Sequence, residues 1–65
     1  MKNNVYERND IVKFLYEGDI KKGIVTSVDR YLFGEMSEQI DYDVYSEEEN
    51  ILYKHINELS IIEKC

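Results

Sequence analysis

The stretch 9–29 constrains the fold of this chain more than any other part of the sequence. It contains two runs rich in Ile, Val and aromatic residues, over 10–16 and 23–29, each about as long as a β-strand. The polar segment between the runs has Gly18 near its middle and Gly23 at its exit. Because glycine supplies the backbone angles of tight turns and bulges, the stretch predicts a β-hairpin with a short, bulged loop.

Alternation of apolar and polar residues predicts the inward face of some strands but not of others. On the first strand Val12, Phe14 and Tyr16 share one face, yet the other face is also partly apolar, as is typical of a small, strongly curved barrel. On the second strand alternation leaves the inward face undecided. Residues 40–46 alternate cleanly. They predict a strand that points Ile40, Tyr42 and Val44 inward and Asp41, Asp43 and Tyr45 outward.

The remaining segments predict short elements joined by turns. Residues 30–39 form a long connection for so small a domain and carry two aromatic residues, which is typical of a packed or functional loop. The other predicted elements are a turn over 47–50, a strand over 51–54, a single 3₁₀ turn over 55–59 and a last strand over 60–63. A helix over 47–59 is the alternative, because Glu and Leu favour helices.

Five short strands with one helical turn before the last predict an all-β fold, a small barrel over residues 10–63. Residues 1–9 are expected to form an arm, with Val5 and Tyr6 lying over the barrel. A set of glycine and apolar positions spread over residues 10–62 resembles SH3-like barrels of the Tudor and KOW type. These positions are Asp10-x-Val12, Gly18, Gly23-x-Val25, Tyr42-x-Val44, Leu52 and Ile56-x-x-Leu59-x-Ile61.

The resemblance implies two binding chemistries. Tudor domains hold a cationic methylated side chain in an aromatic cage, for which this chain offers Phe14, Tyr16 and Tyr45. KOW-type barrels often contact RNA or ribosomal partners, which requires basic residues interleaved with aromatic ones. The candidates for such a basic edge are Lys13, Lys21, Lys22, Arg30 and Tyr31. Ordinary core and surface roles account for the same residues.

The most unusual feature of the sequence is the segregation of its charge. Between Tyr31 and Tyr53 there is no Lys or Arg, whereas seven carboxylates occur there. The rest of the chain has seven acidic and eight basic residues, so this one segment accounts for the whole negative charge of the chain. We interpret the segment as an acidic face that binds a basic protein surface; the alternative is that acidic edges only block aggregation between strands. The residues of the predicted face are Glu35, Glu38, Asp41, Asp43, Tyr45, Glu47, Glu48 and Glu49.

Charge and composition argue against several other classes of protein. The negative charge opposes binding to nucleic acids and to anionic membranes, and no apolar run is long enough to span a bilayer. Cys65 is the single cysteine and the N-terminal residues do not resemble a signal peptide, so we expect a cytoplasmic protein.

No cofactor, metal or catalytic role is expected from the sequence. The Asp41-x-Asp43 spacing lacks the glycine and the final acid of a calcium loop, and His55 has no second ligand at zinc spacing. No residues form a nucleophile and base pair in the sequence pattern, so we expect no enzyme.

The sequence therefore predicts a non-catalytic protein-binding module. Its composition, without Pro or Trp, is typical of AT-rich genomes such as those of low-GC bacteria and their phages. In that setting the partner is a host or defence protein with a basic nucleic-acid channel, inhibited because carboxylates stand in for phosphates. The alternative is a nucleic-acid-associated or ribosome-associated module that uses the basic first hairpin. A homodimer through an open edge strand is the oligomer that so small a domain suggests.

Overall fold

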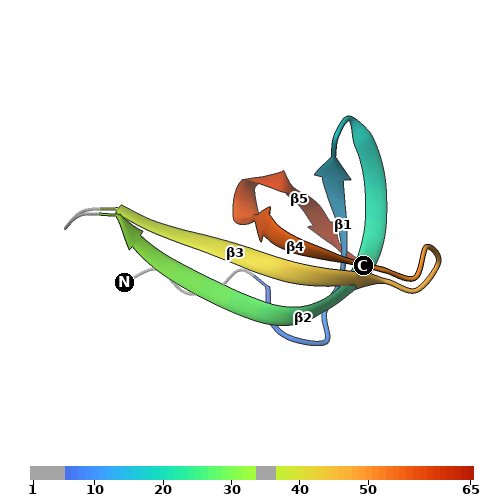
Figure 1. Cartoon of the computed structure of the whole chain (residues 1–65), viewed down its shortest axis with the longest axis horizontal. Coiled ribbons are helices and arrows are strands. Elements are labelled where there is room, and N and C mark those ends of the chain that lie inside the picture. The colour runs from blue at the N-terminus through green and yellow to red at the C-terminus, as the bar shows by residue number, and fades with distance from the viewer. Residues whose placement is uncertain (1–5, 34–36) are drawn as a thin grey trace.

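The computed structural model of the protein describes residues 6–33 and 37–65. Its elements are β1 (Ile11–Tyr16), β2 (Asp19–Phe33), β3 (Ser37–Ser46), β4 (Ile51–Asn57), the 3₁₀ turn η1 (Glu58–Ser60) and β5 (Ile61–Lys64). The strands form one antiparallel sheet in the order β4-β3-β2-β1-β5 (Figure 1). The predicted fold class is confirmed: an all-β chain of five strands with a single 3₁₀ turn before the last one.

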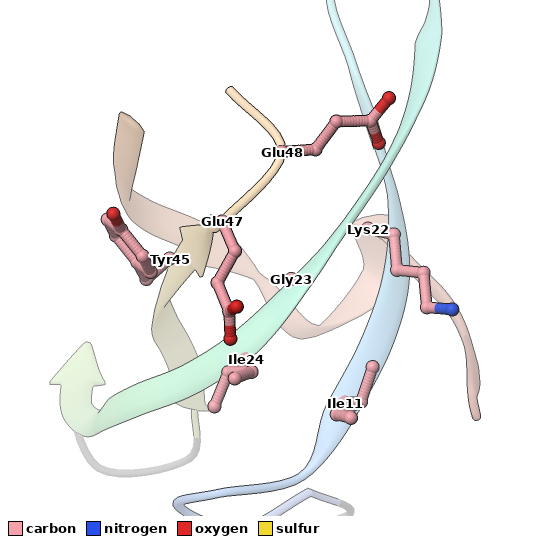
Figure 2. A pocket seen from close by; sticks show the side chains of 7 residues that line it. All are labelled: Ile11, Lys22, Gly23, Ile24, Tyr45, Glu47 and Glu48. Carbon is pink, nitrogen blue, oxygen red and sulfur yellow. The ribbon is translucent and has the colours of Figure 1, made fainter. Parts of the chain in front are cut away.

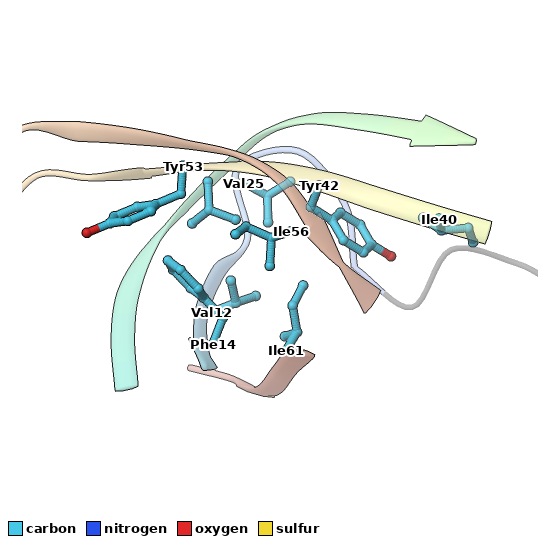
Figure 3. Close-up of a cluster of buried hydrophobic side chains, with 9 residues drawn as sticks. Val12, Phe14, Val25, Ile40, Tyr42, Tyr53, Ile56 and Ile61 are labelled. Atoms are coloured by element: carbon cyan, nitrogen blue, oxygen red, sulfur yellow. The ribbon is translucent and has the colours of Figure 1, made fainter. Parts of the chain in front are cut away.

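The sheet curls so that strands distant in its order pack against each other. The ring of Phe14 in β1 lies 5.3 Å from the ring of Tyr53 in β4, although β2 and β3 lie between these strands in the sheet. The turn η1 contacts both β1 and β3, so it closes the curled sheet on one side. Figure 3 shows the resulting core on the inner face of the sheet, formed by Val12, Phe14, Val25, Ile40, Tyr42, Val44, Tyr53, Ile56 and Ile61.

Tyr6, the first residue that the structure describes, packs onto the inner face of the sheet. Tyr6, which was expected to lie over the barrel, contacts Tyr42 edge to face with ring centroids 5.7 Å apart. Its backbone N–H also donates to the Tyr42 hydroxyl at 3.4 Å. Val5 lies outside the described residues.

The strand β2 is 15 residues long and belongs to two parts of the molecule. Up to Ile24 it pairs with β1, and from Ile24 onward it pairs with β3. We call the part in which β2 residues 27–33 pair with β3 residues 37–43 the ribbon, and the rest of the sheet the body. In Figure 1 the ribbon projects from the body. The prediction of a loop over 30–39 was wrong where the structure describes it, because Arg30–Phe33 and Ser37–Gln39 are paired strand residues.

A β-bulge at Thr26 explains why alternation could not decide the inward face of β2. Val25 lies opposite Val44 and Ser27 lies opposite Asp43, so Thr26 is an extra residue without an opposite partner. Its hydroxyl donates to the carbonyl of Asp43 at 3.2 Å. The inward positions therefore change from odd to even numbers along the strand. Val25 is fully buried and Val28 packs against the same core.

The first hairpin turns more tightly than predicted. Glu17 and Gly18 have φ values of 50° and 84°, which is typical of a two-residue hairpin turn, and β2 already begins at Asp19. Gly23 therefore lies inside β2 rather than at a loop exit, and it is buried. A Cβ atom on Gly23 would lie 2.8 Å from Cγ1 of Val44. The glycine is needed because β2 and β3 approach closely there.

The strand β4 extends to Asn57 and is longer than predicted, and a second bulge lies within it. Tyr42 lies opposite Ile56 and Val44 lies opposite Tyr53, which leaves two β4 residues facing one residue of β3. His55 in this bulge has a φ of 59°. The sequence predicted the 3₁₀ turn over 55–59. It lies over Glu58–Ser60 instead, and the helical alternative for 47–59 is wrong.

Candidate functional site

The outer face of the sheet carries the predicted acidic residues of β3. Because side chains alternate along a strand, Asp41, Asp43 and Tyr45 lie on the face opposite the buried Tyr42 and Val44. Glu47 follows at the same spacing and borders the same surface groove as Tyr45. The structure thus brings together four residues of the predicted face.

A carboxylate that the sequence analysis missed completes this surface. Asp29 of β2 lies directly opposite Asp41, and Asp43 is the next outer residue of β3. Directly opposite side chains on an antiparallel pair have Cβ atoms about 5 Å apart. We call Asp29, Asp41 and Asp43 the acidic group. Asp29 could not be assigned to it without the register, since the bulge at Thr26 decides which face Asp29 takes.

Asp41 is buried, which corrects the prediction that it is exposed on the outer face. Its relative accessibility is only 7%. The amide of Gln39 donates to its carboxylate at 3.0 Å and the amide of Asn57 at 3.4 Å. The Nδ1 atom of His55 lies 4.0 Å from the same carboxylate. Asp41 is thus held by two neutral amides. Because its side chain is buried, it adds negative charge to the outer face but offers little surface for direct contact.

Two further side chains lie beside the acidic group. The backbone N–H of His55 donates to the Asp43 carboxylate at 3.2 Å, and the His55 ring lies 3.5 Å from the Tyr31 hydroxyl. Desolvation, together with the negative charges of Asp29, Asp41 and Asp43, raises the pKa of Tyr31 above its usual value. The pKa of the Tyr31 phenol therefore depends on the negative charge of the acidic group.

The turn after β3 divides its three glutamates between two roles. Glu49 accepts hydrogen bonds from the Tyr53 hydroxyl at 2.7 Å and from Lys21 at 3.0 Å, and both contacts lower the pKa of Glu49. The hydrogen bond to Glu49 in turn raises the pKa of Tyr53. All three glutamates are exposed, but Glu49 is a structural residue, whereas Glu47 and Glu48 form no ion pair with any described residue.

The other predicted acidic residues do not join the outer face. By strand alternation Glu38 lies on the face of Ile40, and it borders a different groove together with Glu58 and Leu59. Glu35 lies outside the described residues.

The alternative basic edge is brought together only in part, because Lys13, Lys21 and Lys22 border one groove while Arg30 and Tyr31 lie in the ribbon. Lys13 and Lys22 lie opposite each other on the outer face, and Lys13 pairs with Glu63 at 3.5 Å. Lys21 lies on the other face and pairs with Glu49. Of the remaining two residues, Arg30 lies on the inner face of the ribbon, opposite Ile40, and Tyr31 lies among the carboxylates of the outer face.

The three candidates for an aromatic cage do not converge on one site. Phe14 is fully buried in the core. Tyr16 stacks edge to face on Tyr53, with centroids 4.8 Å apart. Tyr45 lies on the opposite, outer face, where its hydroxyl donates to the side chain of Asn50.

An apolar row crosses the outer face next to the acidic group. The register places Ile11 opposite Ile24, Ile24 opposite Tyr45 and Tyr45 opposite Leu52, so the four residues follow one another across four strands. We call these four residues the apolar row. Figure 2 shows the groove over three of them, which is lined by Ile11, Lys22, Gly23, Ile24, Tyr45, Glu47 and Glu48.

Within residues 6–33 and 37–65, no group of three or more His, Cys, Asp or Glu side chains is arranged to hold a metal ion. None of the helical segments in this described part is long and apolar enough to cross a membrane. His55 is exposed in the bulge of β4 rather than on the 3₁₀ turn, and Cys65 is exposed after β5.

Comparison of the chain with protein-family models, with curated proteins and with solved structures finds no match.

Proposed function

We propose that this chain is a small, non-catalytic protein-binding module of the SH3-like barrel type. It acts by docking its outer face, whose negative charge comes mainly from the acidic group, onto a basic surface of another protein. The two exposed glutamates that follow β3 extend the same negative surface. In a phage or prophage setting, the partner is a host or defence protein whose basic surface otherwise holds nucleic acid.

The observation that carries this proposal is the opposition of Asp29 and Asp41. Like charges directly opposite each other destabilise an antiparallel pair, by about 0.2–1 kcal/mol. The amides around Asp41 hold its carboxylate in place without neutralising it. A sequence that keeps this unfavourable pair beside Asp43 gains most when a cationic surface compensates the three charges from outside.

The nucleic-acid-binding alternative has less support. Phosphate backbones are bound through several Lys or Arg side chains acting together. Lys13, Lys21 and Lys22 border one groove, but Lys13 pairs with Glu63 and Lys21 pairs with Glu49, and Glu48 and Glu49 line the same groove. The repulsion from a chain of net charge −6 works against such binding as well.

The experiment that tests the proposal compares protein capture by three immobilised chains. The first is the natural chain and the second carries Asp29→Asn, Asp41→Asn and Asp43→Asn, which remove the charges but keep an oxygen acceptor at each position. The third carries Glu17→Gln, Asp19→Asn and Glu63→Gln, which change the net charge equally at sites on the first hairpin and on β5. Bacterial extract is applied, and bound proteins are eluted with salt.

We expect basic proteins to bind to the natural chain and to the third chain, and to be lost from the second. Added oligonucleotide should compete for them if the captured surface normally holds nucleic acid. Equal capture by all three chains contradicts the proposal. Direct binding of the oligonucleotide to the natural chain, weakening steeply with salt, would instead favour the basic-hairpin alternative.

A further inference from the structure

We infer that the apolar row is the docking site for a basic amphipathic helix of the partner protein. The apolar stripe of the helix lies along the row, and its Lys or Arg residues face the carboxylates on both sides. This inference rests on the proposed function, because it assumes that the negative outer face meets a cationic protein.

The apolar row is accessible on the surface of the molecule. Ile11 at one end is 42% exposed and Leu52 at the other end is 43% exposed, while Ile24 and Tyr45 between them are half-buried. A contiguous row of this kind differs from scattered surface hydrophobics, which are normal on soluble proteins. The hollow over Ile11, Ile24 and Tyr45 lets an incoming side chain contact several row members at once.

Carboxylates border the row on both sides. Along β3, Asp43 precedes Tyr45 by two residues and belongs to the acidic group. On the other side, Glu47 and Glu48 line the groove together with one cation, Lys22. Lys13, which lies opposite Lys22 on this side, pairs with Glu63, so each side of the apolar stripe carries a net negative charge. An amphipathic helix with basic flanks has the complementary pattern, an apolar stripe between two cationic borders.

The dimensions of the row also suit a short helix. Neighbouring strands lie about 4.8 Å apart, so a row across four strands is about 14 Å long. This length corresponds to about two and a half turns of α-helix at 5.4 Å per turn. A helix of three turns presents three or four apolar side chains along one stripe, enough to cover the row.

A second copy of this chain does not fit the surface equally well. Every copy carries a net charge of −6, and both borders of the row are negative. Self-association through this face would therefore bring like charges together. With a cationic partner, the contact between the charged borders is attractive instead.

The test uses synthetic peptides of 14 residues and the isotope-labelled full chain, followed by NMR titration. The first peptide has Leu at helical spacing on one face and Lys elsewhere. The second has the same composition in scrambled order, the third has Ser in place of Leu, and the fourth has Glu in place of Lys. We expect the first peptide to shift the amide signals of the apolar row and to bind at least about tenfold more tightly than the second and third, because only it can bury a continuous stripe.

Substitutions in the row provide the second part of the test. Ile11→Thr and Leu52→Thr should each weaken the first peptide about fivefold, since each removes part of an apolar contact. Ile20→Thr is the matched control. It alters an exposed isoleucine of the same outer face, 67% accessible, at the far end of the first hairpin, and should leave the affinity unchanged.

The outcomes separate this inference from the proposed function. If the Lys–Leu and Lys–Ser peptides bind equally and both need the acidic group, the proposed function stands and the helix site is overturned. If no lysine peptide binds, both fall. Binding of the Glu–Leu peptide as tightly as the first overturns the charge argument. A change in the sedimentation of the chain alone on Leu52→Thr assigns the row to a second copy, and also overturns the inference.

Discussion

The two parts of β2 share an inner face but differ completely on the outer face. Where β2 pairs with β1, its outer residues are Ile20, Lys22 and Ile24. Where it pairs with β3 in the ribbon, they are Ser27, Asp29 and Tyr31. Both parts place a valine toward the same core.

The difference shows how stability and charge are distributed along one strand. In the body, close approach of β2 and β3 at Gly23 and burial of Val25 hold the sheet together. In the ribbon, Asp29 opposes Asp41 and works against the pairing that keeps the two strands together. We conclude that the body and the inner side of the ribbon, with Ile40 and Tyr42 in the core, maintain the fold, whereas the outer side of the ribbon carries the charge proposed for binding. The following predictions test this division, beginning with the largest expected effect.

Adding a methyl group at Gly23, in the part of β2 that belongs to the body, should strongly destabilise the protein. We expect Gly23→Ala to lower the free energy of unfolding by about 3 kcal/mol, because overpacking forces rigid neighbours apart. The new Cβ would meet the side chain of Val44 at 2.8 Å and also the backbone of Tyr45. Urea unfolding followed by circular dichroism measures the change.

Gly18→Ala is the control for this experiment. Its φ of 84° makes alanine unfavourable, by about 1 kcal/mol, but no atom lies within 4 Å of the position of a new Cβ. If both variants lose the same free energy, the close approach at Gly23 is not a determinant of stability.

Removing one charge from the ribbon should stabilise the protein slightly. We expect Asp29→Asn to raise the free energy of unfolding by about 0.5 kcal/mol, because it ends the repulsion across the strand pair. The change should shrink at high salt, where exposed charges are screened. Asp19→Asn in the body part of the same strand, opposite Tyr16, serves as the control. A loss of stability in the Asp29 variant would show that the acidic group supports the ribbon rather than opposing it.

Acid should weaken the body through Glu49. The Tyr53 hydroxyl and Lys21 hold the pKa of Glu49 below its usual value of 4.5, so the folded chain binds this proton less readily than the unfolded chain. The stabilisation is therefore present above about pH 4.5 and is lost as the pH falls through the lowered pKa. Urea midpoints at neutral and acidic pH should show a smaller acid-induced loss for Glu49→Gln than for the natural chain.

The matched variant for this comparison is Glu48→Gln. Glu48 is the adjacent residue and forms no ion pair with the described residues, so its substitution should leave the acid-induced loss unchanged. An equal effect of both substitutions would assign the acid sensitivity to net charge instead.

The smallest effect concerns a titration in the ribbon. Desolvation and the carboxylates of Asp29, Asp41 and Asp43 raise the pKa of Tyr31 above its usual value of 10. Neutralising the three carboxylates should lower this pKa, while desolvation keeps part of the increase. The ring signals of Tyr31, followed by NMR against pH, measure the change. Tyr53 is the internal control, since its raised pKa depends first on Glu49 in the body. Parallel shifts of both tyrosines would contradict the separation of the two regions.

Much of the fold could be predicted from local patterns. The clean alternation correctly assigned Ile40, Tyr42 and Val44 to the inner face of β3, and all three are buried. Runs of β-branched and aromatic residues located β1, and the single 3₁₀ turn before the last strand was expected in the right region. The errors occurred where the sequence lacks a regular alternation of apolar and polar residues. Residues 19–22 and the described parts of 30–39 are strands because their backbones pair with neighbouring strands, which the sequence pattern does not show.

The candidate site was predicted only in part. The segregation of charge pointed to the right strand, and Asp41, Asp43, Tyr45 and Glu47 do lie on one side of β3. The burial of Asp41 could not be predicted from the sequence. One of the two amides that donate to its carboxylate, that of Gln39, comes from the same strand, but the other, that of Asn57, comes from β4 and is brought there by the fold. The apolar row could not be predicted from the sequence either, since its four residues lie on four strands and become neighbours only through the register.

The sequence by itself determined the fold class, the inward residues of β3 and that the negative charge is concentrated in one segment. Only the tertiary structure decided which of these charges meet. The physical reason is that a single extra residue in a strand reverses the faces of every residue after it. The bulge at Thr26 places Asp29 against Asp41, and the bulge at His55 aligns Tyr53 and Ile56 on the core. Such bulges depend on contacts between strands that are distant in the chain.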